Sequence, residues 1–293
     1  MSTAPPPVGV YRVRHTSRYA YAETVSLSMH QVRLTPRESE AQAVRGSQLV
    51  IDPPASGSIT REDYFGNATT TFTIQDAHRH LRVTAESLVS VSGRSRDNLD
   101  SPSLTDAVAR LRARETAEEL AAVEYQVESP LAPRGNLYAR YAATLLDPRR
   151  PLLEGVDALM RTIHREFRYD PVATTVSTTV SEVLEERHGV CQDFAHLMIA
   201  CLRSHGVPAR YVSGYLVPKP GVVGAQASHA WVSVYCPGVG WVDFDPTNDL
   251  RPAGGHITLG WGRDFEDVSP LKGVTVGGDS HSVTVEVLVT PAG

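Results

Sequence analysis

A cysteine lies at the predicted start of a helix, in the segment HGVCQDFAHLMIACLRSHGVPAR of residues 188–210. Apolar residues from Phe194 onward recur at the spacing of one helix face, and the glycine and proline of SHGVPAR end the pattern. Cys191 lies in the first turn, where unpaired backbone N–H groups and the positive end of the helix dipole stabilise a thiolate. The same N–H groups can donate to a developing oxyanion, which makes Cys191 a candidate nucleophile. Cys201, in the middle of the apolar stripe, is typical of a small buried core residue.

Two alternating runs downstream could bring a base and a carboxylate to this thiol. SHAWVSVY places His229 on the same strand face as Trp231, and GWVDFDPT places Asp243 and Asp245 together on a face of a second strand. The segment CPGVG between the runs predicts a turn, so the two strands should form a hairpin. With pairing symmetric about Gly238, His229 is diagonal to Asp245, at roughly 7 Å between backbones. Asp243 lies nearer the turn, so Asp245 is the favoured partner of the histidine.

The three residues together predict nucleophilic acyl transfer. Cys191 would attack a carboxamide or peptide carbonyl, and His229 would protonate the leaving amine. Asp245 would fix the tautomer of the imidazole and stabilise the imidazolium. Ser228, directly before the histidine, is interpreted as a strand-entry residue and not as a nucleophile.

A zinc site built from His188, Cys191 and His196 is the competing interpretation of this segment. On a helix, positions 191 and 196 differ by roughly 140° of rotation, and neither CxxC nor HExxH is present. An acidic calcium loop of the DxDxDG type is also absent from the sequence. We therefore expect no metal and no other cofactor, with His196 and His205 on a polar helix face or in a loop.

The sequence pattern around these residues changes near residue 100, from the alternation typical of strands to the spacing typical of helices. Residues 11–91 contain the alternating runs YRVRHTSRYAY, SLSMHQVRL, SQLVIDPP, ATTTFTIQD and HLRVTAESLVSV, separated by turn residues. They predict an antiparallel β-domain over residues 1–97, which ends in the polar segment SGRSRDNLDSPS. Helical spacing follows in DAVARLRARETAEELAAV, LLEGVDALMRTIHREF and SEVLEERHG. In the third helix, Thr179 and Glu182 have capping-box spacing and Gly189 stands at the expected C-terminus.

The end of the chain predicts one more strand. SVTVEVLVTP alternates, and we assign it to the same unit as the candidate triad, so that residues 98–293 form one catalytic core. The segment GRDFEDVSP before it carries Arg263, Asp264, Glu266 and Asp267. We expect a solvated charged loop there, with a rim of the substrate site as the alternative.

Composition excludes several classes of protein. The 293 residues carry a net charge of −5 and no run of Lys or Arg, which disfavours nucleic acid as a partner. No stretch of about 18 apolar residues is present, so we expect no membrane span. The N-terminus does not have the pattern of a secretory signal, and three scattered cysteines do not form a disulfide framework. These features predict a cytoplasmic protein.

The motifs also resemble those of a known family. GVCQDFAHLMIACLRSHGVPARYVSGYL, SHAWVSVY and GWVDFDPTND resemble the three core motifs of the transglutaminase-like superfamily, in the order cysteine, histidine, aspartate. YRVRHTSRYAY, RLTPR, DYFGN and LRVTAESLVSV resemble the N-terminal β-domain of bacterial transglutaminase-like proteins. GGHITLGWGRDFEDVSPLKGV is similar to the C-terminal signature of the same proteins. The resemblance therefore covers most of the chain.

The resemblance implies an α+β fold, with the N-terminal antiparallel β-domain followed by a papain-like or transglutaminase-like core whose catalytic helix packs on an antiparallel sheet. It implies Cys191, His229 and Asp245 as the catalytic residues of a cysteine-protease-like or transglutaminase-like enzyme of bacterial type. It also implies Tyr169 as a second oxyanion donor, the alternative being a tyrosine packed at a helix end. Peptides or amides would be the substrates, with water or an amine as the acyl acceptor. A catalytically silent binding module on the same fold is the other class.

Overall fold

The computed structural model describes residues 8–92, 100–171 and 178–292. Its N-terminal part is a large antiparallel sheet with the strand order β2-β5-β1-β4-β3. Strand β1 is long and continuous and joins the two runs that the sequence presents at residues 11–21 and 26–34. It pairs first with β5 and then with β4, and its register shifts between Ala20 and Val25. The strands are β1 (Val8–Val32), β2 (Gln42–Asp52), β3 (Gly57–Glu62), β4 (Ala68–Ile74) and β5 (His78–Ser92).

The C-terminal strands complete this same sheet, which corrects the predicted domain assignment. Strands β12 (Leu271–Gly277) and β13 (His281–Pro291) both pair antiparallel with β1. The predicted strand therefore exists, but it belongs to the N-terminal sheet and not to the catalytic core. Alternation reveals a strand and its apolar face, whereas the partner is decided by the free edge that β1 offers. The predicted boundary at residues 97 and 98 touches residues 93–99, which lie outside the described residues.

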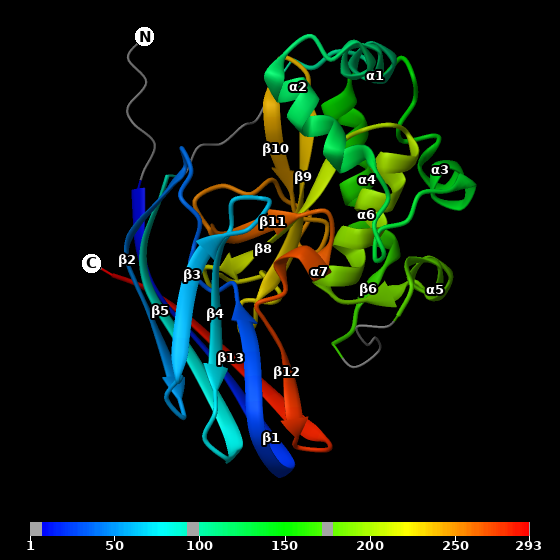
Figure 1. The fold of residues 1–293 in the computed structure, drawn as a ribbon. Coiled ribbons are helices and arrows are strands. Elements are labelled where there is room, and N and C mark those ends of the chain that lie inside the picture. Colours follow the sequence, from blue (N-terminus) through cyan, green and yellow to red (C-terminus); the bar gives the residue numbers. More distant parts are fainter. Residues whose placement is uncertain (1–7, 93–99, 172–177, 293) are drawn as a thin grey trace.

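A second, smaller sheet carries the candidate site. It is fully antiparallel, with the order β10-β9-β8-β11, and β11 is one of its edges. Every residue of β9 is buried, because helices cover one face of the sheet and the N-terminal sheet lies toward the other (Figure 1). Its strands are β8 (Ala209–Leu216), β9 (His229–Cys236), β10 (Gly240–Phe244) and β11 (His256–Gly262). Two-residue strands β6 (Arg168–Tyr169) and β7 (His188–Gly189) pair in parallel among the helices (Figure 1).

The helices follow the predicted amphipathic segments with one interruption. The first predicted helix is two, because Arg114 adopts a left-handed conformation (φ 56°) and Thr116 then starts a new helix with a capping box. The helices are α1 (Leu104–Ala113), α2 (Ala117–Ala122), α3 (Asn136–Ala142), α4 (Leu152–Glu166), α5 (Val180–Glu186), α6 (Cys191–Ser204) and α7 (Phe265–Val268), with a 3-10 turn at Val123–Gln126. In the described part of the chain, no helix has the length and apolar character needed to cross a bilayer.

Two large hydrophobic cores hold these layers together, and a small third cluster lies around Leu111, Ala122 and Tyr235. One lies between α6, the surrounding helices and the face of β9 formed by Ala230, Val232 and Val234. The other lies inside the N-terminal sheet and also contains residues of β8 and β11, including Tyr215 and Ile257. The small sheet is thus packed from both sides. This arrangement confirms the predicted α+β fold, with a helix that starts at the candidate nucleophile packed on an antiparallel sheet.

Candidate active site

Helix α6 places Cys191 at its first residue, as predicted. The preceding residue, Val190, is extended and its N–H donates to Asp193 Oδ2 at 2.8 Å, which fixes the start of the helix. The rest of α6 is almost entirely buried, whereas Cys191 is half-buried. Cys201 and Cys236 are fully buried, so Cys191 is the one cysteine of the chain with accessible surface.

Gly189 is needed for this helix start, although not for the predicted reason. The residue that ends α5 in a left-handed conformation is Arg187 (φ 58°), and Gly189 lies in β7. A Cβ atom on Gly189 would lie 2.7 Å from Asp193 Oδ2. The glycine therefore lets the capping carboxylate approach the backbone beside the thiol. The capping box of α5, formed by Thr179 and Glu182, is confirmed.

The hairpin has the register that the sequence predicts. Trp241 pairs with Tyr235 and Asp243 pairs with Ser233. Strand β10 ends at Phe244, and Asp245 forms a backbone bridge with Leu250 in the following turn. His229 Nε2 and Asp245 Oδ2 are 2.8 Å apart, and both side chains are fully buried. The diagonal contact inferred from the turn is therefore present.

Asp245 is held by five hydrogen bonds. Its Oδ1 accepts from the backbone N–H groups of Thr247 and Asn248 at 3.0 and 3.2 Å. Its Oδ2 accepts from His229, from Asn248 Nδ2 at 2.9 Å and from His256 Nε2 at 3.0 Å. Burial alone would raise the pKa of Asp245, but the His229 charge and the hydrogen bonds of the two histidines hold it well below its ordinary value. The carboxylate is thus fixed in position and ionised.

The imidazole of His229 is placed between this carboxylate and the thiol. Burial lowers the pKa of His229, but the Asp245 charge and the interactions with Cys191 outweigh it and raise the pKa to about 10. Because Nε2 bonds Asp245, the nitrogen left for the sulfur is Nδ1, which is buried and has no hydrogen-bond partner among the described residues. This arrangement leaves Nδ1 available to the nearby Cys191, while the carboxylate supports the protonated ring.

His256 is a member of the site that the sequence reading missed. It begins β11, and its ring packs edge-on against Trp231 with the ring centroids 5.1 Å apart. The available signal was a histidine at the head of the alternating run HITLGWG, in the same position that His229 has in its own strand. The partner of that histidine could not be inferred, because β11 is separated from the hairpin by a loop.

No hydrogen bond joins Asp243 to His229 among the described residues. Its Oδ2 accepts from Trp231 Nε1 at 3.3 Å, and the residue is half-buried. Tyr169 lies opposite Gly189 in the β6–β7 pair, which brings it to the start of α6. Burial raises the pKa of Tyr169, and the nearby Cys191 raises it further. The tyrosine is therefore close enough to Cys191 to interact with it electrostatically, while its side chain also packs against the helical core.

Three other polar residues that the sequence analysis considered are Ser228, His196 and His205. Ser228 directly precedes β9, consistent with a strand-entry residue. His196 is buried, which contradicts the expected polar face. Its ring lies 5.0 Å from that of Tyr211, its Nε2 accepts from the N–H of Phe265, and burial lowers its pKa to about 4. His205 caps the end of α6, with Nδ1 3.0 Å from the carbonyl oxygen of Cys201.

One cluster has ligand atoms close enough for a metal ion, but it is not the zinc site considered above. Atoms of His229, Asp245 and His256 lie within 4.8 Å of one another. Both histidine Nε2 atoms already lie at hydrogen-bond distance from the same Asp245 oxygen. This arrangement fits protons between the nitrogens and the carboxylate, so we assign the cluster to the hydrogen-bonded triad.

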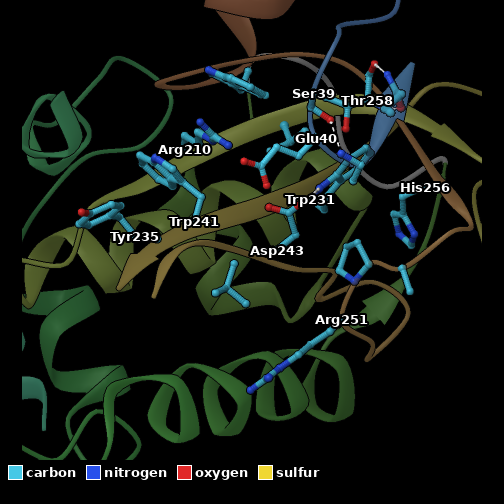
Figure 2. Close-up of a pocket in the computed structure, with 18 of the residues that line it drawn as sticks. Ser39, Glu40, Arg210, Trp231, Tyr235, Trp241, Asp243, Arg251, His256 and Thr258 are labelled. Carbon is cyan, nitrogen blue, oxygen red and sulfur yellow. Dashed lines mark hydrogen bonds between the residues drawn. The ribbon is translucent and has the colours of Figure 1, made fainter. Parts of the chain in front are cut away.

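A cavity of 730 Å³ lies on the face of the small sheet that α6 does not cover (Figure 2). Its lining includes Arg210, Trp241 and Asp243 from the sheet and Glu40 from the N-terminal part, while Cys191, His229 and Asp245 do not line it. The Arg210 guanidinium stacks on Trp241 and Trp261, at 4.1 and 3.7 Å from the ring centroids. His256 lines this cavity and also contacts Asp245, so it separates the cavity from the triad.

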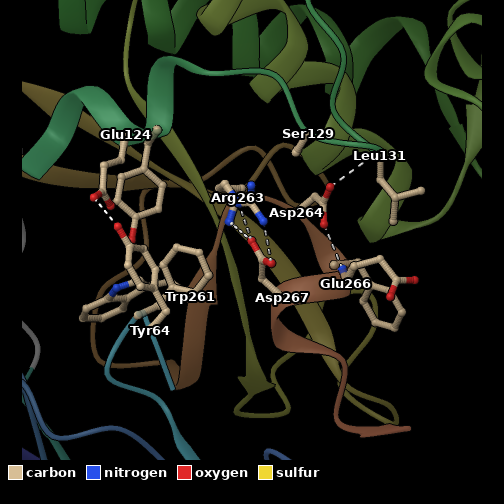
Figure 3. A network of polar contacts seen from close by, with 12 residues as sticks. Tyr64, Glu124, Ser129, Leu131, Trp261, Arg263, Asp264, Glu266 and Asp267 are labelled. Atoms are coloured by element: carbon tan, nitrogen blue, oxygen red, sulfur yellow. Dashed lines mark hydrogen bonds and ion pairs between the residues drawn. The ribbon is translucent and has the colours of Figure 1, made fainter. Parts of the chain in front are cut away.

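The charged segment near the C-terminus is a packed polar network and not a solvated loop (Figure 3). Asp264 is almost completely buried and caps α7 by accepting from the N–H of Glu266 at 2.9 Å. It also accepts from the N–H of Leu131 at 3.0 Å, while Arg263 and Asp267 form an ion pair at 3.0 Å. Asp264 and Asp267 find partners inside the fold while Glu266 is exposed, so the expectation was wrong for the buried part of the segment.

Two family models and several relatives match this chain. Residues 139–246 match the Transglutaminase-like superfamily, and residues 11–90 match the Bacterial transglutaminase-like N-terminal region. Protein Rv2569c of Mycobacterium tuberculosis is 38% identical over 96% of this chain and 92% of its own length. Protein ML0607 of Mycobacterium leprae is 34% identical over 95% of this chain and 98% of its own length.

Two further similarities cover less sequence or only the fold. A protein-glutamine gamma-glutamyltransferase of Pseudomonas aeruginosa is 30% identical over 42% of this chain and 20% of its own length. A crystal structure from Cytophaga hutchinsonii, described as a "Putative Cysteine Protease", has a TM-score of 0.78 and 19% identity, and the match covers 97% of this chain and 91% of that one. With both domains matched and relatives aligned along nearly the whole length, this chain belongs to the transglutaminase-like superfamily, with the N-terminal domain of its bacterial members.

Proposed function

We propose that this protein is a thiol-dependent enzyme that hydrolyses amide or peptide bonds through a thioacyl intermediate on Cys191. The observation that carries the proposal is the buried 2.8 Å contact between His229 and Asp245, with Cys191 close enough to raise the pKa of the imidazole. A buried ion pair of this kind is costly to desolvate and contributes little to stability on balance. Its position beside an accessible thiol at a helix start supports a catalytic role.

The reaction would proceed in two halves. In the first, the Cys191 sulfur attacks the carbonyl carbon, and the N–H groups at the start of α6 donate to the oxyanion, with Tyr169 as the proposed second donor. His229 then gives its Nδ1 proton to the leaving amine, which departs and leaves a thioester on Cys191. In the second half, neutral His229 takes a proton from water as the water attacks the thioester, and the acid is released. Asp245 stays ionised and holds the ring throughout.

The second acyl acceptor distinguishes hydrolysis from amine transfer. If a primary amine attacks the thioester in place of water, the product is a new amide, as in transglutamination. The named activity of the Pseudomonas aeruginosa relative supports this alternative, while the description of the Cytophaga hutchinsonii protein supports hydrolysis. The two outcomes need the same residues of this chain, so the triad alone does not choose between them.

The test is a library of peptides and glutamine-containing amides, assayed for cleavage, for ammonia release and for incorporation of a labelled amine. Mass spectrometry of acid-quenched enzyme should detect an acyl group on Cys191 during turnover. Cleavage or ammonia release without amine incorporation supports the hydrolase. Amine incorporation supports the transferase, and neither activity with any substrate would contradict the enzyme proposal.

A silent binding module is the second candidate, and a substrate-free assay separates it from an enzyme. Because Cys201 and Cys236 are fully buried, iodoacetamide should label the folded protein once, at Cys191. If the thiolate–imidazolium pair exists, the labelling at pH 6 should be faster than that of a free cysteine derivative at the same pH. Labelling at or below the rate of the free thiol supports the binding module.

A cytoplasmic location of this protein remains a prediction from the sequence.

A further inference from the structure

A second histidine, His256, faces the same carboxylate oxygen as the histidine of the candidate triad. Asp245 Oδ2 accepts from His229 Nε2 at 2.8 Å and from His256 Nε2 at 3.0 Å, and the two rings are tilted at 60° to each other. His256 does not lie between Asp245 and the thiol. It lies behind the carboxylate, on a different strand, with its side chain almost fully buried.

We propose that His256 is a positioning residue that holds Asp245 toward His229, and that the N-terminal β-domain holds His256 in place through strand β11. This inference rests on the proposed function, because it assigns to the N-terminal domain a part in the same chemistry. The first half follows from the geometry of the carboxylate. Thr247 and Asn248 fix Oδ1 from the turn that follows Asp245, whereas His256 is the donor to Oδ2 that comes from outside the hairpin and its turn.

The charges around His256 are consistent with a donor role. The carboxylate of Asp245 faces it from the end of β10, and His229 faces it from β9 with a ring separation of 6.1 Å. Lys219 lies beside the neighbouring residue Gly255, since a Cβ there would be 3.5 Å from the ammonium nitrogen. Trp231 covers one side of the ring. Asp245 is therefore the acceptor toward which the His256 N–H is directed.

The outer edge of β11 is where the N-terminal domain contacts the strand that carries His256. This strand is an edge of the small sheet, so one row of its backbone groups has no strand partner. Gln42 fills part of that row with its side-chain amide. Its Oε1 accepts from the N–H of Thr258 at 2.8 Å, and its Nε2 donates to the carbonyl oxygen of Thr258 at 2.8 Å. The side chain thus imitates one step of a neighbouring strand.

Asn67 does the same three residues further along β11. Its Oδ1 accepts from the N–H of Trp261 at 3.0 Å, and its Nδ2 donates to the carbonyl oxygen of Trp261 at 2.9 Å. A register shift between Thr258 and Gly260 explains the spacing, because a bulge turns residue 261 to the side on which an unbroken strand would place residue 260. Both amides are buried, and both come from the N-terminal domain.

The N-terminal domain therefore contributes no residue of the triad, yet it completes the edge of the strand that begins with His256. Gln42 acts only two residues from that histidine along β11. Loosening this edge would let the first residue of β11 move, and with it one donor to Asp245. The expected consequence is weaker orientation of His229 without loss of substrate contacts.

The experiment compares two substitutions of the histidine. His256→Gln keeps an N–H donor that can reach Asp245, whereas His256→Leu removes it. We expect His256→Leu to lower kcat at least about tenfold with KM nearly unchanged, and His256→Gln to recover most of the loss. Because the Asp245 charge raises the pKa of His229 to about 10, a less well oriented carboxylate should also move the alkaline limb of the activity profile to lower pH. A merely structural role would not shift this limb.

The link to the N-terminal domain has a matched control on the same strand. Gln42→Leu removes the amide that bonds Thr258, while Gln48→Leu changes an exposed glutamine of β2. Gln42→Leu should lower kcat and shift the alkaline limb in the direction of His256→Leu, and Gln48→Leu should behave as the wild type. If His256→Leu fails to fold, the comparison of Gln42→Leu with Gln48→Leu decides the question. Unchanged kcat and pH profile in folded Gln42→Leu would overturn the link, and the same result in folded His256→Leu would overturn the positioning role.

Iodoacetamide labelling of Cys191 separates this proposal from the proposed function. The label needs no substrate, and its rate at pH 6 reports the thiolate that His229 supports. We expect slower labelling in His256→Leu than in His256→Gln or the wild type. If the wild type turns over no substrate but this difference is found, the proposed function fails and the positioning role stands. Equal labelling rates in the three folded proteins would overturn the positioning role alone.

Discussion

Replacing Asp245 by asparagine tests the electrostatic design of the site most directly. The substitution keeps the size of the side chain but removes the charge and one acceptor atom. In the native protein, two histidines and three turn donors point at this carboxylate. An amide NH₂ in place of one oxygen would face N–H donors, so His229 would lose both its ion pair and its orientation.

The size of the effect can be estimated from the pKa of His229. With a pKa of about 10, the imidazolium outnumbers neutral imidazole about 1000 to 1 at pH 7. Without the carboxylate, burial still lowers this pKa and only the interactions with Cys191 still raise it. At the ordinary value of 6.5 the ratio would be about 1 to 3, and the full difference of about 5 kcal/mol is an upper limit for the contribution of Asp245. We therefore expect Asp245→Asn to lower kcat at least about a hundredfold with little change in KM.

The matched control is Asp243→Asn. Asp243 is half-buried and contacts only the indole N–H of Trp231 at 3.3 Å among the hydrogen bonds of the described residues, so its loss should cost far less turnover. Steady-state kinetics of both variants, on a substrate found in the library, give the comparison. Equal losses in the two variants, or a larger loss for Asp243→Asn, would refute the assignment of Asp245 as the partner of His229.

Asp245→Asn should also change the free energy of unfolding. The folded-state pKa of His229 is raised above 6.5, so the contribution of the pair is complete below pH 6.5 and is lost as the pH rises toward about 10. The pKa of Asp245 is lowered, so its contribution is lost as the pH falls below the ordinary value near 3.8. Urea unfolding should show the largest deficit of Asp245→Asn, about 3–5 kcal/mol, between these limits. A deficit that grows from pH 7 to pH 10 would contradict this reasoning.

Three further predictions follow from the structure. Cys191→Ala should abolish turnover with an unchanged melting temperature, whereas Cys201→Ala should lower stability by about 1 kcal/mol and spare turnover; thermal unfolding and kinetics together check both. Gly189→Ala should push the Asp193 carboxylate from the start of α6 and lower kcat several-fold, because the new Cβ would lie 2.7 Å from an Asp193 oxygen; a variant with native kinetics would show that the carboxylate can shift freely. Deleting residues 271–293 should give aggregated protein, since it exposes the edge of β1 along its pairing with β13; a soluble, monomeric and active truncation would contradict this.

The local parts of the site could be predicted because each depends on neighbours in the sequence. The tight turn at Gly238 sets the register of the hairpin, and that register places His229 one diagonal step from Asp245. The apolar stripe after Phe194 locates the start of α6, and with it Cys191. In both cases a short segment and its periodicity contain all the information that the placement requires.

Features that depend on contacts between distant residues could not be predicted, because no short segment contains the information about both partners. Alternation in SVTVEVLVTP identifies a strand, but strand β13 finds its partner more than 250 residues away, at β1. Likewise, polarity suggests that His196 is exposed, whereas its ring is buried against Tyr211 because α6 is covered on all sides. Periodicity specifies which face of an element is apolar, and tertiary packing decides which other surface covers it.

His256 lies in a strand that local periodicity predicts, but its contacts come from residues that are distant in the sequence. Its own strand is recognisable from local alternation, but its role depends on Asp245 in front of it and on Gln42 behind it, 216 residues before Thr258 in the chain. In the proposed role of His256, the orientation of the Asp245 carboxylate depends on the contact of the N-terminal sheet with the edge of β11. A fragment that contains Cys191, His229 and Asp245 but lacks the N-terminal sheet would keep the residues of the triad without the support that fixes them. This dependence gives a physical reason for the presence of both domains in one chain.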